Sequence, residues 1–193
     1  MRSIAVFASG SGSNFEAIMN AIENGNLQAK VSLVVCDKPG AKVIERANKF
    51  GIESFVAVPK NYENKAAYER EIVRQLTDKK VDFIVLAGYM RLIGETLLTQ
   101  YRGKIVNVHP SLLPAFPGLD AVGQAFRAGV KITGVTIHFV DEGMDTGPII
   151  AQTAITIEQG ETIEMLEKKI HDKEHTLYPQ TLQTLFSSQS IKI

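Results

Sequence analysis

The chain has 193 residues, of which 45% are apolar and 22% charged, and its formal net charge at pH 7 is zero. This balance is typical of a globular protein that buries its own core. The neutral charge provides no general attraction to nucleic acid or to an anionic membrane. The single cysteine, Cys36, excludes an internal disulfide. The first apolar run, residues 4–8, is too short for a signal peptide or a membrane span. We therefore expect a cytoplasmic protein, a monomer or homodimer, whose partners are small molecules.

The first 110 residues alternate between short apolar runs and amphipathic segments. The runs expected to form buried strands are residues 4–8, 31–35, 83–87 and 105–108. The segments expected to form helices are residues 14–23, 41–50 and 62–77. Strands that alternate with helices predict a parallel sheet covered on both faces.

After Pro110 the pattern changes. Prolines at 114 and 117 and Gly118 indicate an irregular loop, which is followed by a short helix at residues 121–128. Residues 131–140 and 149–157 alternate apolar and polar side chains around a polar glycine loop, which predicts an antiparallel pair. Residues 161–186 are expected to be helical and to be kinked or split at Pro179, with the last residues frayed.

Residues 1–193 contain no repeat, low-complexity tract or linker, so a single domain is expected. The predicted fold class is α/β, with a mostly parallel sheet flanked by helices and an antiparallel C-terminal portion. The first half, residues 1–108, carries the strand–loop–helix units, and residues 109–193 carry the antiparallel strands and the C-terminal helix.

The loop at residues 9–14, Ser-Gly-Ser-Gly-Ser-Asn, lies between the first strand and the first helix. Backbone N–H groups at a helix N-terminus favour an anion, and glycines let the backbone approach it closely. The alternative is a flexible turn with a helix cap. Phe15 stands where a dinucleotide motif needs a third glycine, although Asp37 could imitate its ribose-binding acid. No lysine completes a P-loop, so the loop predicts a monophosphate site.

Asn107 and His109 lie two residues apart at the end of a predicted strand and should project to the same face. An amide can stabilise an oxyanion and an imidazole can donate or accept a proton, so the pair suits acyl transfer. Asp145, in the glycine loop between the antiparallel strands, could orient the imidazole. The alternatives are a structural histidine and a turn-forming aspartate.

His171, Glu174 and His175 have the His-x-x-Glu-His spacing of some zinc proteases. Beyond His175 the sequence contains no further Asp, Glu, His or Cys to complete a zinc site. We therefore expect no metal, and interpret the segment as a helix turn in which Glu174 is available for a substrate contact.

Five stretches together resemble the phosphoribosylglycinamide formyltransferases, folate-dependent enzymes of purine synthesis. They are residues 9–14, 86–93, 107–114, 141–148 and 174–179, and they occur in the family's order. The resemblance implies a Rossmann-like fold, with the phosphate site in residues 1–108 and the folate site in residues 109–193. It also implies formyl transfer from 10-formyltetrahydrofolate to the amine of glycinamide ribonucleotide. The implied products are formylglycinamide ribonucleotide and tetrahydrofolate, in de novo purine synthesis.

The resemblance also implies roles for particular residues. The implied catalytic residues are Asn107, His109 and Asp145. The implied phosphoribosyl-binding residues are Gly12, Ser13, Asn14 and Glu174. The implied folate-binding residues are Lys65, Met90, Arg91, Leu92, Ile93, Asn107, Val140, Asp141 and Glu142.

Some of these residues have a simpler interpretation. Met90, Leu92 and Ile93 would otherwise be core or hinge residues, and Arg91 a solvated surface arginine. Lys65 stands where the family often has an arginine, so it keeps the charge but not the planar fork. Residues 115–117 are a variable part of the family loop and are assigned no role.

Several other functions compete with this one. Methionyl-tRNA formyltransferases usually carry a further C-terminal domain and a basic RNA surface, and formyltetrahydrofolate deformylases an added N-terminal domain. A nucleotide-binding oxidoreductase would use the glycine loop together with Asp37. A phosphate-binding module without catalysis would leave Asn107, His109 and Asp145 without a role.

Overall fold

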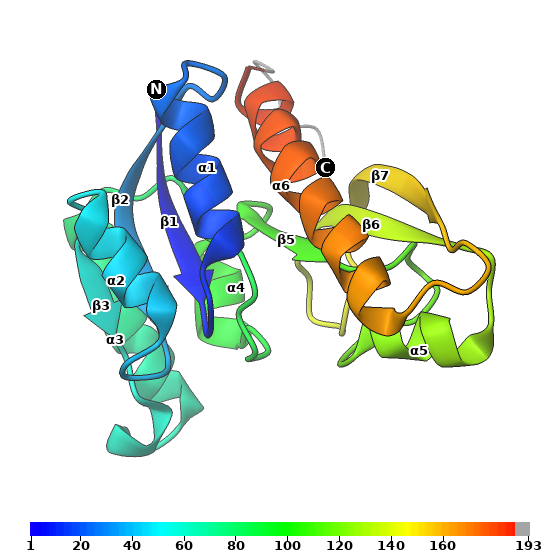
Figure 1. Ribbon diagram of the computed structural model, residues 1–193. Coiled ribbons are helices and arrows are strands. Elements are labelled where there is room, and N and C mark those ends of the chain that lie inside the picture. Colours follow the sequence, from blue (N-terminus) through cyan, green and yellow to red (C-terminus); the bar gives the residue numbers. More distant parts are fainter. Residues whose placement is uncertain (188–193) are drawn as a thin grey trace.

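A computed structural model describes residues 1–187, and the fold there is a seven-stranded sheet with helices on both faces (Figure 1). The spatial order of the strands is β3-β2-β1-β4-β5-β6-β7. Their bounds are β1 Arg2–Ala8, β2 Ala29–Cys36, β3 Ser54–Val56, β4 Phe83–Leu86, β5 Ile105–His109, β6 Ile132–Phe139 and β7 Ile149–Thr156. The fraying expected for the last residues concerns positions outside the described part of the chain.

The first five strands in spatial order are parallel, whereas β6 and β7 are antiparallel to their neighbours. The central strands are almost continuously apolar because both faces of the sheet are covered. The predicted fold class, mostly parallel with an antiparallel C-terminal portion, is confirmed.

The helices divide between the two faces of the sheet. Their bounds are α1 Ser13–Glu23, α2 Lys42–Lys49, α3 Lys65–Asp78, α4 Glu95–Gln100, α5 Ala121–Ala128 and α6 Ile163–Ser187, with a 3₁₀ turn, η1, at Pro59–Asn61. One apolar cluster joins α1, α2 and α6 to the sheet, and a second cluster on the opposite face joins α3 and α4 to it. Two separate cores therefore hold the sheet from its two sides.

The sequence did not predict β3, α4 or η1, which have three, six and three residues. Periodicity is not visible in segments this short. The helix expected from residue 62 begins at Lys65, because the Asn64 side chain accepts a hydrogen bond from Ala67 N–H and caps it. Pro179 was expected to kink or split the last helix, and the split is contradicted. The helix continues through Pro179, which is itself buried.

The strand order reverses between β1 and β4. From β1 the chain proceeds to β2 and β3 along one half of the sheet, and from β4 it proceeds to β5, β6 and β7 along the other. In open α/β sheets the loops that diverge at such a point leave a crevice beyond the carboxyl ends of the strands. The glycine loop follows β1, so the topology places it at this crevice.

Candidate functional site

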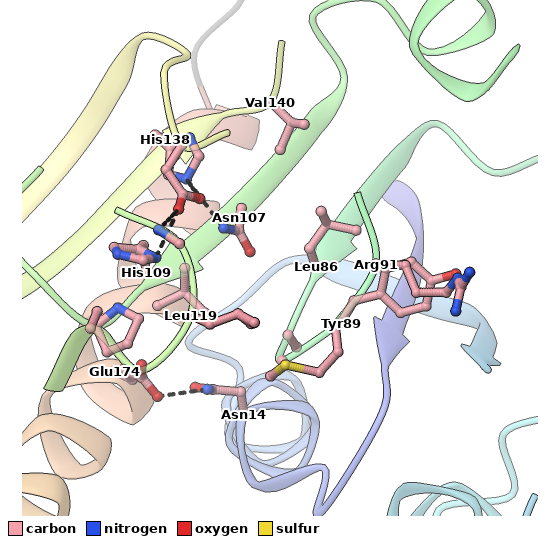
Figure 2. Close-up of a pocket in the computed structure, with 18 of the residues that line it drawn as sticks. Asn14, Leu86, Tyr89, Arg91, Asn107, His109, Leu119, His138, Val140 and Glu174 are labelled. Atoms are coloured by element: carbon pink, nitrogen blue, oxygen red, sulfur yellow. Dashed lines mark hydrogen bonds and ion pairs between the residues drawn. The ribbon is translucent and has the colours of Figure 1, made fainter. Parts of the chain in front are cut away.

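A cavity of about 650 Å³ lies at the carboxyl ends of the parallel strands. Its wall is built from segments far apart in the sequence, and Figure 2 shows Asn14, Asn107, His109, His138 and Glu174 drawn together around it. The lining comes from the glycine loop, the loops after β4, β5 and β6, and one face of α6. A cavity of this size suits a small-molecule ligand.

The glycine loop is held against α2 by two of its carbonyl groups. Val43 N–H donates to Gly10 O at 3.1 Å, and Arg46 Nε donates to Ser11 O at 2.8 Å. Gly12 has φ +74°, and a Cβ there would lie 2.7 Å from Val43 Cβ. Both the conformation and the close approach therefore require glycine at this position.

Three predicted substrate residues lie at the start of α1. Gly12, Ser13 and Asn14 all line the cavity, and the N-cap Gly12 has no side chain to cap α1, although Ser13 N–H donates to Ser11 Oγ at 3.4 Å. N–H groups at a helix N-terminus are suited to an anion. The loop thus has the geometry that the sequence predicted for a phosphate.

Glu174 faces the same part of the cavity from α6. One turn further along the helix, the buried Tyr178 hydroxyl donates to Leu86 O at 2.9 Å and Val106 O at 3.0 Å. Residues four apart share a helix face, so this anchor turns Glu174 toward the cavity. Asn14 Nδ2 donates to Glu174 Oε2 at 2.9 Å. Burial raises the pKa of Glu174, and the hydrogen bond from Asn14 only partly offsets this.

The predicted catalytic residues come together. Asn107 and His109 are on β5, and Asp145 reaches them from the loop after β6. His109 Nδ1 lies 3.4 Å from Asp145 Oδ2, which also accepts a hydrogen bond from Gly118 N–H at 2.8 Å. Asp145 has φ +57°, a left-handed conformation that aspartate tolerates better than most residues. Both His109 and Asp145 are largely buried, so the contact is sheltered from water.

The other ring nitrogen of His109 contacts the loop after β5. His109 Nε2 donates to Phe116 O at 2.9 Å. Residues 115–117 were assigned no role from the sequence, yet the Phe116 carbonyl fixes the ring through the nitrogen that does not face Asp145. The contact is made by the backbone, so no side-chain pattern could have indicated it.

His138 is a site residue that sequence reasoning missed. It lies on β6 directly opposite Asn107, with Asn107 Nδ2 3.2 Å from His138 Nε2. Its Nε2 is also 3.7 Å from Asp145 Oδ1. His138 is one of several polar residues in the alternating pattern of this strand, and its importance depends on the β5–β6 register, which the sequence did not provide.

The predicted folate-binding residues of the loop after β4 fall into two groups. Met90 and Leu92 are 60% and 58% exposed at the cavity, whereas Ile93 is buried, so only Ile93 fits the simpler interpretation of a core residue. Arg91 is not simply a solvated arginine. Its guanidinium lies 3.9 Å from Asp37 Oδ2 and 5.8 Å from the centroid of the Tyr68 ring.

The loop after β6 carries three more predicted folate residues, and all three line the cavity. Val140 N–H donates to Ile105 O at 2.9 Å, which continues the β5–β6 pairing. Asp141 Oδ1 accepts from Gly143 N–H and from the Thr146 hydroxyl, so its side chain shapes the loop itself. Glu142 is exposed and lies 3.9 Å from Arg102.

Lys65 does not line the cavity. It is exposed at the first position of α3, and its Cε packs near Gly94. A contact between Lys65 and the tail of a bound folate therefore stays a prediction.

The three residues with zinc-protease spacing, His171, Glu174 and His175, do not all face the cavity. His171 and Glu174 line the cavity, whereas His175 is turned so that its Nε2 is buried with no hydrogen-bond partner among residues 1–187. Within the same residues no group of three or more His, Cys, Asp or Glu is placed to hold a metal ion. The helices of the described part also include none that is long and apolar enough to cross a membrane.

Comparisons with known proteins agree with the geometry. A sequence model of the formyl transferase family matches residues 2–182. The phosphoribosylglycinamide formyltransferase of Bacillus subtilis is 62% identical over 185 residues, which cover 96% of this chain and 95% of that protein. The crystal structure of the phosphoribosylglycinamide formyltransferase of Bacillus halodurans superposes with a TM-score of 0.95 at 58% identity, covering 98% and 97% of the two chains.

A second solved relative is glycinamide ribonucleotide transformylase 1 of Geobacillus kaustophilus. It gives a TM-score of 0.94 at 63% identity and covers 96% of this chain and 98% of its own. The resemblance predicted from the sequence is confirmed by these matches. Because the family model and the relatives each span nearly the whole sequence, the chain belongs to the formyl transferase family.

Proposed function

We propose that this protein transfers the formyl group of 10-formyltetrahydrofolate to the amine of glycinamide ribonucleotide, yielding formylglycinamide ribonucleotide and tetrahydrofolate in de novo purine synthesis. The observation that carries the proposal is the meeting of Asn107, His109 and Asp145 in one cavity. The names and high identity of the relatives support the choice of substrates.

The acceptor fits the side of the cavity formed by α1 and α6. Its phosphate would bind the N–H groups at Gly12, Ser13 and Asn14, because the loop carbonyls at Gly10 and Ser11 are engaged by α2. Glu174 would accept hydrogen bonds from the ribose hydroxyls. The Asn14–Glu174 hydrogen bond holds the two contact points in a fixed relation.

The donor fits the apolar mouth of the cavity. Four of the exposed large hydrophobic side chains line it: Met90, Leu92, Leu119 and Met144. Exposed apolar side chains gathered at one pocket favour a ligand with flat aromatic rings. The donor's pterin would lie between the loops after β4 and β6, which places its formyl group near Asn107.

The chemistry is a direct transfer. The neutral acceptor amine attacks the formyl carbon, and the carbonyl oxygen becomes an oxyanion, which is stabilised by a hydrogen bond from Asn107 and by the positive charge of protonated His109. The new C–N bond forms, the bond from carbon to the folate nitrogen breaks, and the amine's proton passes to that nitrogen through water oriented by Asp145. Both ring nitrogens of His109 face acceptors, Asp145 and Phe116 O, and only the doubly protonated ring donates to both.

The test is an assay of the purified protein with glycinamide ribonucleotide and 10-formyltetrahydrofolate, following tetrahydrofolate release with and without a chelator. We expect turnover that depends on both substrates and is unchanged by the chelator. Absence of turnover, or dependence on a removable metal ion, would overturn the proposal.

Three further statements belong to the same proposal. We place the enzyme in the cytoplasm, acting as a monomer or homodimer on small molecules alone. Residues 1–193 would act as one domain, in which residues 1–108 form the phosphate-binding half and residues 109–193, with the loop after β6 and the C-terminal helix, complete the folate site.

A further inference from the structure

The loop after β4, residues 87–94, forms one side of the cavity mouth, and we call it the donor loop. Its side chains alternate in direction. Tyr89 packs edge-on against Phe7 with ring centroids 5.3 Å apart, and Ile93 is buried, whereas Met90 and Leu92 are exposed at the cavity. An irregular loop can present two apolar side chains in this way only if its backbone is held in place.

Ser9 holds the first half of the donor loop. Its N–H donates to Gly88 O at 3.0 Å, and its hydroxyl oxygen accepts from Met90 N–H at 2.9 Å. Ser9 is only 3% exposed, so these bonds are shielded from water. They continue the pairing of β1 with β4 beyond the end of β4, where Ala87 N–H donates to Phe7 O at 2.8 Å.

Glu69 holds the other end. Its carboxylate accepts from Gly94 N–H at 2.6 Å and from Leu97 N–H at 3.3 Å, across the junction between the donor loop and α4. The N-cap residue of α4 is Gly94, which has no side chain to accept these hydrogen bonds. Glu69 is 2% exposed, and a carboxylate buried to this degree is costly unless it is hydrogen-bonded. Its position is therefore explained by the two backbone groups that it fixes.

Neither Ser9 nor Glu69 lines the cavity, although the donor loop between their contacts does. We propose that both are positioning residues for the formyl donor, which hold residues 88–94 in the conformation that the donor's rings require. This inference rests on the proposed function, because it names the donor site of that reaction. Ser9 begins the glycine loop but, unlike Gly12, Ser13 and Asn14, it does not line the cavity, so neither Ser9 nor Glu69 is placed to contact the acceptor.

The test compares Ser9→Ala and Glu69→Gln with the unmodified enzyme by steady-state kinetics and by calorimetric titration with tetrahydrofolate. We expect the KM for the donor and the Kd for tetrahydrofolate to rise roughly three- to tenfold, as for one lost hydrogen bond. The KM for the acceptor and kcat at saturating donor should stay within about twofold of the unmodified enzyme. The lost interaction binds the donor equally well in the ground state and the transition state, so its loss raises KM and not the barrier of the chemical step.

Ser32→Ala is the matched control, because it also removes one hydroxyl hydrogen bond within the sheet, that with Ser3 at 2.8 Å, but far from the donor loop. It should leave both KM values unchanged. If Ser9→Ala leaves donor binding unchanged, or lowers kcat and raises both KM values alike, the inference is wrong. If Glu69→Gln does not fold, the donor KM and the tetrahydrofolate Kd of Ser9→Ala are sufficient to test the inference. A wild-type enzyme that transfers no formyl group would instead reject the proposed function.

Discussion

His138 Nε2 lies 3.2 Å from Asn107 Nδ2, across the antiparallel pair of β5 and β6. The other ring nitrogen of His138 donates to Phe139 O at 2.7 Å. In the neutral ring Nε2 is therefore an acceptor, and it fixes the amino group of Asn107. Burial lowers the pKa of His138, and the hydrogen bond to Phe139 O and the charge of Asp145 counteract this only in part. His138 thus sets which way the Asn107 amide faces.

Replacing His138 with leucine should therefore lower kcat by roughly tenfold or more, because the Asn107 amide loses its orientation toward the reacting oxygen. The measurement is kcat at saturating concentrations of both substrates. His171→Leu is not a suitable control because that residue lines the cavity. The informative control is the acceptor KM of the same variant, which should change little, since the glycine loop is untouched. An unaltered kcat would contradict this role.

The same residue should make stability depend on pH. The pKa of His138 is lower in the folded protein than its ordinary value of 6.5, so below that value the unfolded chain binds a proton that the folded protein does not. The contribution of neutral His138 to the free energy of unfolding is therefore complete above pH 6.5, and it decreases as the pH falls toward the folded pKa. Urea midpoints measured from pH 7.5 to 5.5 should fall more steeply in the wild type than in His138→Leu. Parallel curves would show that His138 does not contribute.

The sequence identified Asn107 and His109 because the two-residue period of a strand depends only on neighbouring positions. It could suggest Asp145 but could not show that it meets His109, since that contact depends on β6 pairing antiparallel with β5 and on the left-handed backbone of Asp145. His138 was missed for the same reason. Local patterns fix an element, whereas register and loop conformation are decided by packing between distant segments.

Asp145→Asn should lower kcat by roughly a hundredfold or more while leaving the acceptor KM nearly unchanged. The amide keeps the size of the carboxylate but removes the charge that faces His109 Nδ1 at 3.4 Å, so protonated His109 loses its partner. The measurement is steady-state kinetics with both substrates varied. Asp172→Asn, the same change at an exposed residue of α6 paired with Lys168, should retain wild-type turnover. Equal losses in the two variants would contradict a specific role.

Gly12→Ala should weaken the glycine loop. The added Cβ would lie 2.7 Å from Val43 Cβ, and φ +74° is strained for alanine, so we expect a loss of about 1–3 kcal/mol in the free energy of unfolding. The acceptor KM should rise because the N–H groups at Ser13 and Asn14 are displaced. Urea unfolding and kinetics measure the two effects. Gly10→Ala, where nothing lies within 4 Å of the new Cβ, should keep wild-type stability.

Glu174→Gln should stabilise the protein at neutral pH and impair acceptor binding. Burial raises the pKa of Glu174 above its ordinary value of 4.5. Below 4.5 the carboxyl is protonated in both states, and as pH rises through 4.5 the unfolded chain releases a proton that the folded protein retains. The cost of the buried charge thus develops above pH 4.5 and is complete above the raised folded pKa. Urea midpoints of the variant and the wild type should coincide near pH 4 and diverge, in favour of the variant, toward pH 7.5.

The acceptor KM of Glu174→Gln should rise roughly tenfold or more, since a charged acceptor of the ribose hydroxyls becomes a neutral one. The donor KM should change little, because the Glu174 side chain is hydrogen-bonded to Asn14 at the acceptor site and has no contact with the donor loop among the hydrogen bonds of residues 1–187. Glu45→Gln, at an exposed position of α2, should show neither the shift in urea midpoint nor the change in KM. If the variant gains stability while its acceptor KM is unchanged, Glu174 does not bind the acceptor. If it gains stability and its acceptor KM rises, the buried carboxylate lowers the free energy of unfolding but is needed to bind the acceptor.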